Sequence, residues 1–233
     1  MSNITRDDLK LLSQWDTPTI CNGLELISPD SRSAGFTTQN MICSDPKLPP
    51  IVGFARTATI RSRRPSTLSV DAQKTLNRVY YAHIAETPQP TITIIQDLDS
   101  PAGFGAWWGE VHTTIHKAFG CLGTVTNGSI RDLNECASGF QMLAGSVGPS
   151  HAHVHTVEVG CEVRIFSMTV RPGDIIHADQ HGAVVVPIGS VKKLPKAIDL
   201  IMRREKTVLD AARSSDFDVD KLMNTIALTS KIH

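Results

Sequence analysis

The chain has 233 residues, enough for one sizeable hydrophobic core, and its 23 Lys and Arg residues balance its 23 Asp and Glu residues. This balance gives no net field for a nucleic acid or an anionic membrane, and no apolar run reaches the roughly 18 residues of a membrane span. The five cysteines are odd in number and match neither a disulfide framework nor a CxxC zinc site. We therefore expect a soluble cytoplasmic protein that binds a small molecule, with no nucleic-acid and no membrane partner.

The first hundred residues contain signals for helices and strands in alternation. Thr5 followed by Asp8 predicts a capping box and a short helix from about residue 6. Pro18 suits the first turn of a second helix. Strand, helix and strand are then predicted, in this order, over Gly53–Ile60, Ala72–Ile84 and Thr91–Asp97.

The middle of the chain predicts two further helices around one strand. A helix beginning near Gly109 would place Val111, Ile115 and Ala118 on one face. A strand follows over residues 123–127. After the Gly128-Ser129 turn, helical spacing predicts a second helix that carries Leu133, Ala137, Phe140 and Ala144.

The last third changes character. Residues 153–186 contain short strand patterns separated by turn signals at Gly160, Pro172-Gly173 and His181-Gly182, which predicts an antiparallel unit. A closing helix is predicted over residues 191–213, with Leu194, Ile198, Ile201 and Leu209 on its apolar side.

The most informative local pattern joins Gly109-Glu110 to Arg131-Asp132 across twenty residues, with Glu135 three positions further on. Both acidic ends are expected at helix starts, where backbone N–H groups favour a bound carboxylate. Arg131 adds a planar guanidinium, and Asp132 a hard oxygen ligand of the kind magnesium prefers. The same residues also fit a structural interpretation, in which Asp132 and Glu135 form a capping box and Glu110 complements a helix dipole.

This spacing of an acidic residue, twenty residues, Arg-Asp and a second acid resembles the signature of metal-dependent pyruvate aldolases in the RraA-like family. The blocks GCLGTVTNGSIRD and VRPGDIIHADQHGAVVVP are similar to family blocks. The resemblance implies a single RraA-like domain over residues 1–233, a mixed α/β fold of αββα type with a mixed central sheet and helices at both termini. It also implies a homotrimer or homohexamer.

By the same resemblance, Asp132 would ligate Mg²⁺ or Mn²⁺ directly and Glu110 would hold a metal-bound water. Arg131 would bind the substrate near the developing enolate, with Gly109 and Trp108 beside it. Glu205, supplied by a neighbouring subunit, is the candidate for a further water-mediated metal contact. On its own, a glutamate next to two arginines within a helix is typical of a solvated surface pair.

The activity implied is class II aldolase chemistry, in which a 4-hydroxy-2-oxo acid is cleaved to pyruvate and a second carbonyl compound. Decarboxylation of oxaloacetate passes through the same enolate and is expected alongside it. A non-catalytic RraA-type regulator that binds a ribonuclease or another protein is the alternative of a different class. The natural substrate is not encoded in a readable motif.

Other residues allow competing interpretations. His151, His153 and His155 at strand period, or His177, Asp179 and His181, have the ligand types of a zinc site, but they also suit packing and hydrogen bonding between strands. The run Arg61-Ser62-Arg63-Arg64 would attract an acidic substrate or form a solvated loop. Asp97 and Asp99 would support the site or simply end a strand. Trp107-Trp108 would wall an apolar pocket, or lie in the core or at a subunit interface.

Overall fold

The two N-terminal helices begin where their caps predict. In the computed structural model, which describes residues 4–232, Thr5 and Asp8 form a capping box at α1 (Arg6–Leu12). Asp16 caps α2 (Thr17–Ile27), whose first turn contains Pro18, and a 3₁₀ turn over Pro29–Arg32 follows. Both predictions are confirmed, and the helices bury their apolar faces against one side of the central sheet.

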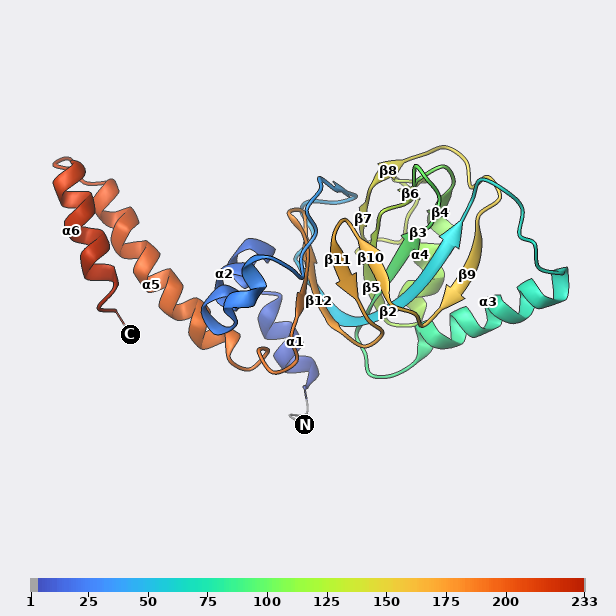
Figure 1. Cartoon of the computed structure of the whole chain (residues 1–233), viewed down its shortest axis with the longest axis horizontal. Coiled ribbons are helices and arrows are strands. Elements are labelled where there is room, and N and C mark those ends of the chain that lie inside the picture. The colour runs from blue at the N-terminus through green and yellow to red at the C-terminus, as the bar shows by residue number, and fades with distance from the viewer. Residues whose placement is uncertain (1–3, 233) are drawn as a thin grey trace.

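Eight strands of the described chain form the central sheet, in the spatial order β1 (Ile42–Cys43), β7 (Gln141–Ala144), β5 (Cys121–Thr126), β3 (Thr91–Asp97), β2 (Ile51–Arg61), β12 (Ile175–Asp179) and β13 (Gly182–Val186), with β9 (His155–Val159) also paired to β2. The central strands β7, β5, β3 and β2 run parallel, and the outer pairs are antiparallel. The sheet is therefore mixed, as predicted, and it is curled (Figure 1).

The core lies on both faces of this sheet. Strand β3 is buried along almost its whole length, as expected for a parallel strand covered on two sides. One face packs on α1 and α2 near the start of β2 and on α3 (Val70–Ala85) further along, with α4 (Glu110–Ala118) next to β5. The opposite face packs against a hairpin of β10 (Val163–Ile165) and β11 (Met168–Val170).

The C-terminal helices form an arm. Helix α5 (Leu194–Ala212) packs on α2 at its start, where Leu194 and Ile198 are buried, and then runs away from the sheet with α6 (Val219–Thr229) folded back along it (Figure 1). The first of these helices is predicted, whereas α6 is not. No helix of residues 4–232 is both long and apolar enough to cross a bilayer.

Two predictions for the middle of the chain are wrong. No helix follows Asp132: residues 133–135 form a turn, and Phe140 and Ala144 belong to the β7 region. Helix α4 buries Thr113 and His116, while Val111 is 65% exposed, so the predicted apolar face points to solvent. The helix packs through polar and aromatic side chains that an apolar periodicity does not detect.

Candidate functional site

The two halves of the motif follow neighbouring parallel strands. Strands β4 (Ala106–Trp108) and β6 (Ser129–Ile130) pair with Trp108 opposite Ile130, and β6 also pairs with β8 (Ser146–Val147) in a small second sheet. Glu110 lies just beyond the end of β4, and Arg131-Asp132 follows β6. Because parallel strands end at the same edge, the twenty residues between the halves form a crossover through α4 and β5 that returns the chain to this edge.

Asp132 is positioned by backbone geometry that differs from the prediction. Its φ is +53°, in the left-handed region, and its carbonyl accepts the N–H groups of Glu135 and Cys136 in a turn. Its Oδ2 accepts the backbone N–H of Glu110 at 3.3 Å. Asp132 therefore caps the start of α4, a helix whose own N-cap, Gly109, has no side chain to do so.

The contact between Asp132 and the start of α4 requires glycine at position 109. A Cβ atom at this position would lie 2.5 Å from Asp132 Oδ2 and 3.3 Å from Arg131 Cγ. The backbone of Gly109 is extended, so the constraint is the close approach of the carboxylate and not the backbone angle. Glycine thus lets the Asp132 carboxylate reach the helix start; the substrate contact predicted for Gly109 stays a prediction.

Arg131 lies beside this carboxylate. Its N–H donates to the carbonyl of Trp108 at 2.9 Å, and its Nε lies 3.8 Å from Asp132 Oδ2. The side chains of Arg131 and Asp132 are 36% and 35% exposed, so a ligand can reach both from solvent. A guanidinium and a carboxylate next to a helix start are arranged to hold an acid and a cation together.

Buried aromatic side chains pack in the core next to the site. The Trp108 side chain is fully buried, 4.6 Å from the His116 ring, so it belongs to the core; its carbonyl, not its ring, contributes to the site. His116 lies 2.7 Å from the Tyr80 hydroxyl, and burial lowers the pKa of His116 to about 3. Burial and the nearby Arg131 lower the pKa of His112 to about 4. Both imidazoles are neutral at pH 7.

His112 is a site neighbour that the sequence analysis missed. It lies on α4 two residues after Glu110, and the charge of Arg131 is close enough to affect its pKa. Its Nδ1 is buried and has no hydrogen-bond partner among residues 4–232. The only signal available in the sequence was a histidine one turn before His116.

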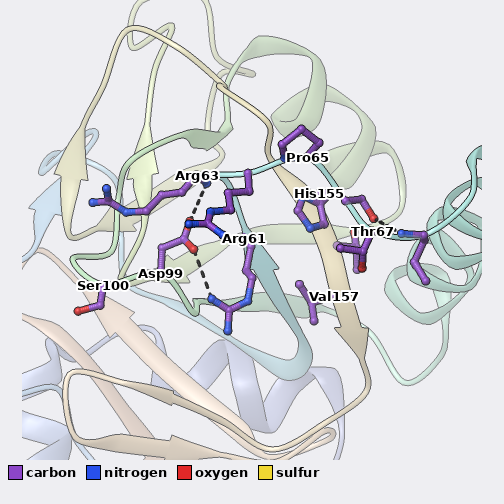
Figure 2. A pocket seen from close by; sticks show the side chains of 12 residues that line it. Arg61, Arg63, Pro65, Thr67, Asp99, Ser100, His155 and Val157 are labelled. Carbon is purple, nitrogen blue, oxygen red and sulfur yellow. Dashed lines mark hydrogen bonds and ion pairs between the residues drawn. The ribbon is translucent and has the colours of Figure 1, made fainter.

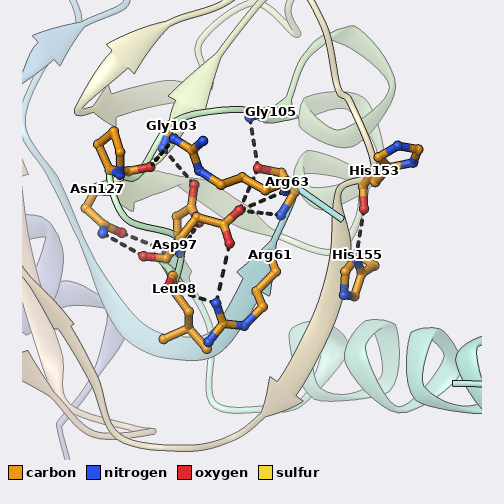
Figure 3. Close-up of polar contacts among 12 residues, drawn as sticks. Arg61, Arg63, Asp97, Leu98, Gly103, Gly105, Asn127, His153 and His155 are labelled. Atoms are coloured by element: carbon orange, nitrogen blue, oxygen red, sulfur yellow. Dashed lines mark hydrogen bonds and ion pairs between the residues drawn. The ribbon is translucent and has the colours of Figure 1, made fainter. Parts of the chain in front are cut away.

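The ends of β3 and β5 hold the loop that precedes β4 (Figure 3). Asp97 exchanges two hydrogen bonds with Asn127, of 2.7 and 2.9 Å, and its Oδ2 accepts the N–H of Gly103 at 2.7 Å. Burial raises the pKa of the Asp97 carboxyl. Of the two interpretations of Asp97, support of the site fits these contacts.

Asp99, two residues after the end of β3, ties the same loop to the segment that follows β2. Its Oδ2 accepts the N–H and hydroxyl of Ser62 and the N–H of Arg63, at 2.7, 3.0 and 2.9 Å. The Ser62 Oγ in turn accepts the N–H of Gly105 at 2.9 Å. These hydrogen bonds lower the pKa of Asp99, so its charge is retained inside the loop.

The donor set fits a hard divalent cation only in part. Glu110 and Asp132 follow strands β4 and β6, which end at the same edge of the small sheet. Within residues 4–232, neither the Glu110 carboxylate nor Asp132 Oδ1 has a hydrogen-bond partner. Two carboxylates plus water and substrate oxygens suit magnesium. No group of three His, Cys, Asp or Glu side chains in the described chain is placed to hold a metal. Glu205 lies on the α5 arm and is not brought to the pair within one chain (Figure 1).

The histidine patterns have other partners. His177 is buried with its ring nitrogens 3.0 Å from Thr17 Oγ1 and from the Trp15 carbonyl, and Asp179 accepts the Thr17 N–H at 2.8 Å. These contacts tie β12 to the start of α2. The rings of His151 and His155 contact neighbouring carbonyls, and the described residues contain no metal cluster there.

A family model described as RraA-like, aldolase/RraA, matches residues 17–185. This range includes the sheet and the whole motif from Gly109 to Glu135, and it ends before the α5–α6 arm. Protein DlpA of Legionella pneumophila is 29% identical over 113 residues, which are 44% of this chain and 18% of DlpA. The chain thus corresponds to a small part of that relative.

Two solved structures share the fold at low identity. An uncharacterized protein from Pseudomonas syringae pv. tomato has a TM-score of 0.68 at 19% identity, over 97% of this chain and 99% of that one. Streptomyces coelicolor RraAS2, described as an unusual member of the RNase ES inhibitor RraA protein family, has a TM-score of 0.68 at 19% identity, over 92% and 100% of the chains. The likeness covers the helical arm as well as the sheet.

Proposed function

The chain belongs to the RraA-like (aldolase/RraA) family, and from this premise we propose that it is a class II, divalent-metal-dependent carbon–carbon lyase that cleaves a 4-hydroxy-2-oxo acid to pyruvate and a second carbonyl compound. The observation that carries the proposal is the meeting of Glu110, Arg131 and Asp132 at the ends of two adjacent strands. A purely structural capping pair has no need of the exposed guanidinium beside it.

The substrate's 2-oxo acid end is bound at Arg131, whose planar guanidinium donates to the carboxylate and to the C2 oxygen. When the C3–C4 bond breaks, its electron pair becomes the enolate of pyruvate, and negative charge develops on the C2 oxygen next to Arg131. The hydroxyl proton at C4 leaves through an intervening water to a Glu110 carboxylate oxygen, and C4 becomes a carbonyl. Protonation at C3 then completes pyruvate.

Mg²⁺ or Mn²⁺ held by Asp132 and, through water, by Glu110 would supply Lewis-acid stabilisation of the same negative charge. We propose that Glu205 of a neighbouring copy completes this set in a homotrimer or homohexamer. Because oxaloacetate yields the same enolate when carbon dioxide leaves, decarboxylation is proposed as a side activity of the site.

The experiment that tests the function measures pyruvate release from 4-hydroxy-4-methyl-2-oxoglutarate and from oxaloacetate, with and without EDTA. Turnover that EDTA removes and Mg²⁺ or Mn²⁺ restores is expected, with the Asp132→Asn variant as the inactive control. Full turnover after exhaustive chelation contradicts metal dependence. No pyruvate from either acid, together with inhibition of a ribonuclease, would favour the regulator instead.

A further inference from the structure

A pocket opens beyond the C-terminal ends of β2 and β3 in the central sheet (Figure 2). It is a cavity of about 620 Å³ between the loop that follows β2, the end of β3 and the start of β9. Arg61, Arg63, Arg64 and His155 are among its lining residues, and Asp99 is its one acidic lining residue. Counting three arginines and one aspartate, the lining has a formal net charge of two positive charges.

The carboxylate of Asp99 already accepts hydrogen bonds from the loop that follows β2. Its side chain is 6% exposed, and one oxygen accepts three hydrogen bonds from Ser62 and Arg63. Its other oxygen lies 3.4 Å from Arg61, whose side chain is half exposed. Asp99 therefore orders the loop and leaves Arg61 able to contact a second anion.

The three arginines have different surroundings. Arg63 turns to the neighbouring loop, where its Nη2 donates to the Pro101 carbonyl and its guanidinium lies 4.7 Å from the Phe104 ring centre. Arg64 is exposed and has no hydrogen bond or ion pair with residues 4–232. Arg61 uses Nη1 for the Leu98 carbonyl, at 3.1 Å, and for Asp99. The other N–H groups of Arg61 and the whole Arg64 guanidinium are thus left for an anionic ligand in one pocket.

The pocket and the motif share one supporting structure. The Gly105 N–H donates to Ser62 Oγ, between the lining residues Arg61 and Arg63, and five residues further on the Glu110 N–H donates to the Asp132 carboxylate. Five residues of extended chain span at most about 18 Å. The pocket lies beyond the C-terminal ends of the parallel strands β2 and β3 of the central sheet, and the motif beyond those of β4 and β6 in the small sheet. In parallel sheets this end of the strands is where ligands bind.

We propose that Arg61 and Arg64 form a second carboxylate-binding site, which takes the distal carboxylate of a dicarboxylic 2-oxo acid. The identity of the ligand rests on the proposed function; the presence of an anion site does not. Guanidinium groups bind carboxylates in bidentate geometry, and a pocket with a positive balance selects acids that carry a charge at both ends.

The test uses two ligands that differ only at the distal end: 2-oxoglutarate, and 2-oxopentanoate, which has a methyl group in place of the second carboxylate. Calorimetric titration in magnesium buffer at low ionic strength should show 2-oxoglutarate binding to the wild type about tenfold more tightly. Arg64→Gln should remove most of this preference and leave 2-oxopentanoate unchanged. Arg78→Gln, at an exposed arginine of α3 outside the pocket, is the matched control.

Equal affinities for the two acids in the wild type, or equal effects of Arg64→Gln and Arg78→Gln, would overturn the site. Arg131→Ala tests whether the carboxylate in the pocket is the distal end of the acid bound at Arg131. If this variant weakens 2-oxoglutarate as well, one molecule spans both places, as proposed; if it does not, a separate acid occupies the pocket and the distal-carboxylate assignment is overturned. Because binding is measured without turnover, an inactive protein that keeps the preference contradicts only the lyase proposal.

Discussion

The carboxylate of Asp132 accepts a hydrogen bond from the backbone N–H of Glu110, 22 positions earlier in the chain, at 3.3 Å. One oxygen of Asp132 is thereby used to cap α4, and the other is left for a ligand. The structural and the chemical interpretations of the motif are therefore compatible, because a single side chain serves both. Substitutions at Asp132 separate the two roles.

Asp132→Asn should abolish turnover and leave the fold intact. Asparagine tolerates the left-handed backbone and still accepts the Glu110 N–H, but it lacks the negative charge. Asp132→Ala loses the cap as well and adds backbone strain, so it should lower the free energy of unfolding by about 1–2 kcal/mol. Urea denaturation and pyruvate release measure the two effects; wild-type turnover in Asp132→Asn would exclude the ligand role.

Gly109→Ala should reduce turnover strongly, because the new methyl group would occupy the place of the Asp132 carboxylate, 2.5 Å away. Gly189→Ala is the control, since nothing lies within 4 Å of a Cβ at that position. We expect at least a tenfold loss of kcat/KM for Gly109→Ala, about 1.4 kcal/mol of transition-state stabilisation. Equal kinetics in the two variants would show that Asp132 has room to move without consequence.

Arg131→Ala should lower kcat and raise KM, because its contact with the C2 oxygen strengthens as charge develops. Arg131→Lys should recover activity only partly, since lysine keeps the charge and loses the planar fork. Steady-state kinetics on one substrate compare the three proteins. A variant with normal kinetics and only a lower melting temperature would make Arg131 structural and remove the basis of the lyase proposal.

The buried histidines predict a loss of stability in mild acid. His116 has a folded pKa of about 3, well below the value near 6.5 expected when unfolded. Between these values the unfolded chain takes up a proton that the folded chain does not, so stability falls as pH drops from 6.5. His116→Gln should flatten the slope by up to about 1.4 kcal/mol per pH unit. Denaturation at pH 7.5, 6 and 5 checks this, and a His116→Gln variant with the wild-type slope would contradict it.

Mixing subunits tests the role proposed for Glu205. Asp132→Asn and Glu205→Gln should each form oligomers of three or six chains by light scattering and should each be inactive. Co-refolded mixtures should regain a fraction of wild-type turnover, because some sites then combine an intact Asp132 with an intact Glu205 from another chain. A monomer, or mixed oligomers without any recovery, would count against this residue.

Local signals in the sequence were sufficient for elements with a strong pattern. The cap at Thr5, Pro18 in the first turn of α2, the apolar run of β3 and the turns of the C-terminal strands are short-range features, and their elements form as predicted. The helix predicted after Asp132 fails because a left-handed residue starts a turn there. Gly139, with φ of +75°, interrupts the same spacing before Phe140.

The site was located by its motif, but its geometry depends on long-range pairing. Strands β4 and β6 have three and two residues, too few to show any alternation, so their ladder leaves no signal in the sequence. Helix α6 escapes prediction for a related reason: its Met223, Ile226 and Leu228 are exposed, so its pattern does not mark a buried face. Pockets formed by distant loops, such as that of Arg61 and Arg64, follow only from the assembled chain.

The short ladder between β4 and β6 also couples the packing of the core to the spacing of the acidic groups. Trp108 and Ile130 are fully buried opposite each other, and each immediately precedes a half of the motif. A slip of one residue would turn a core side chain outward as it displaced Glu110 from Asp132. A change in the spacing of the two acidic groups at this ladder would therefore also disturb the packing of the core, and a protein with such a change would misfold before the effect on activity could appear.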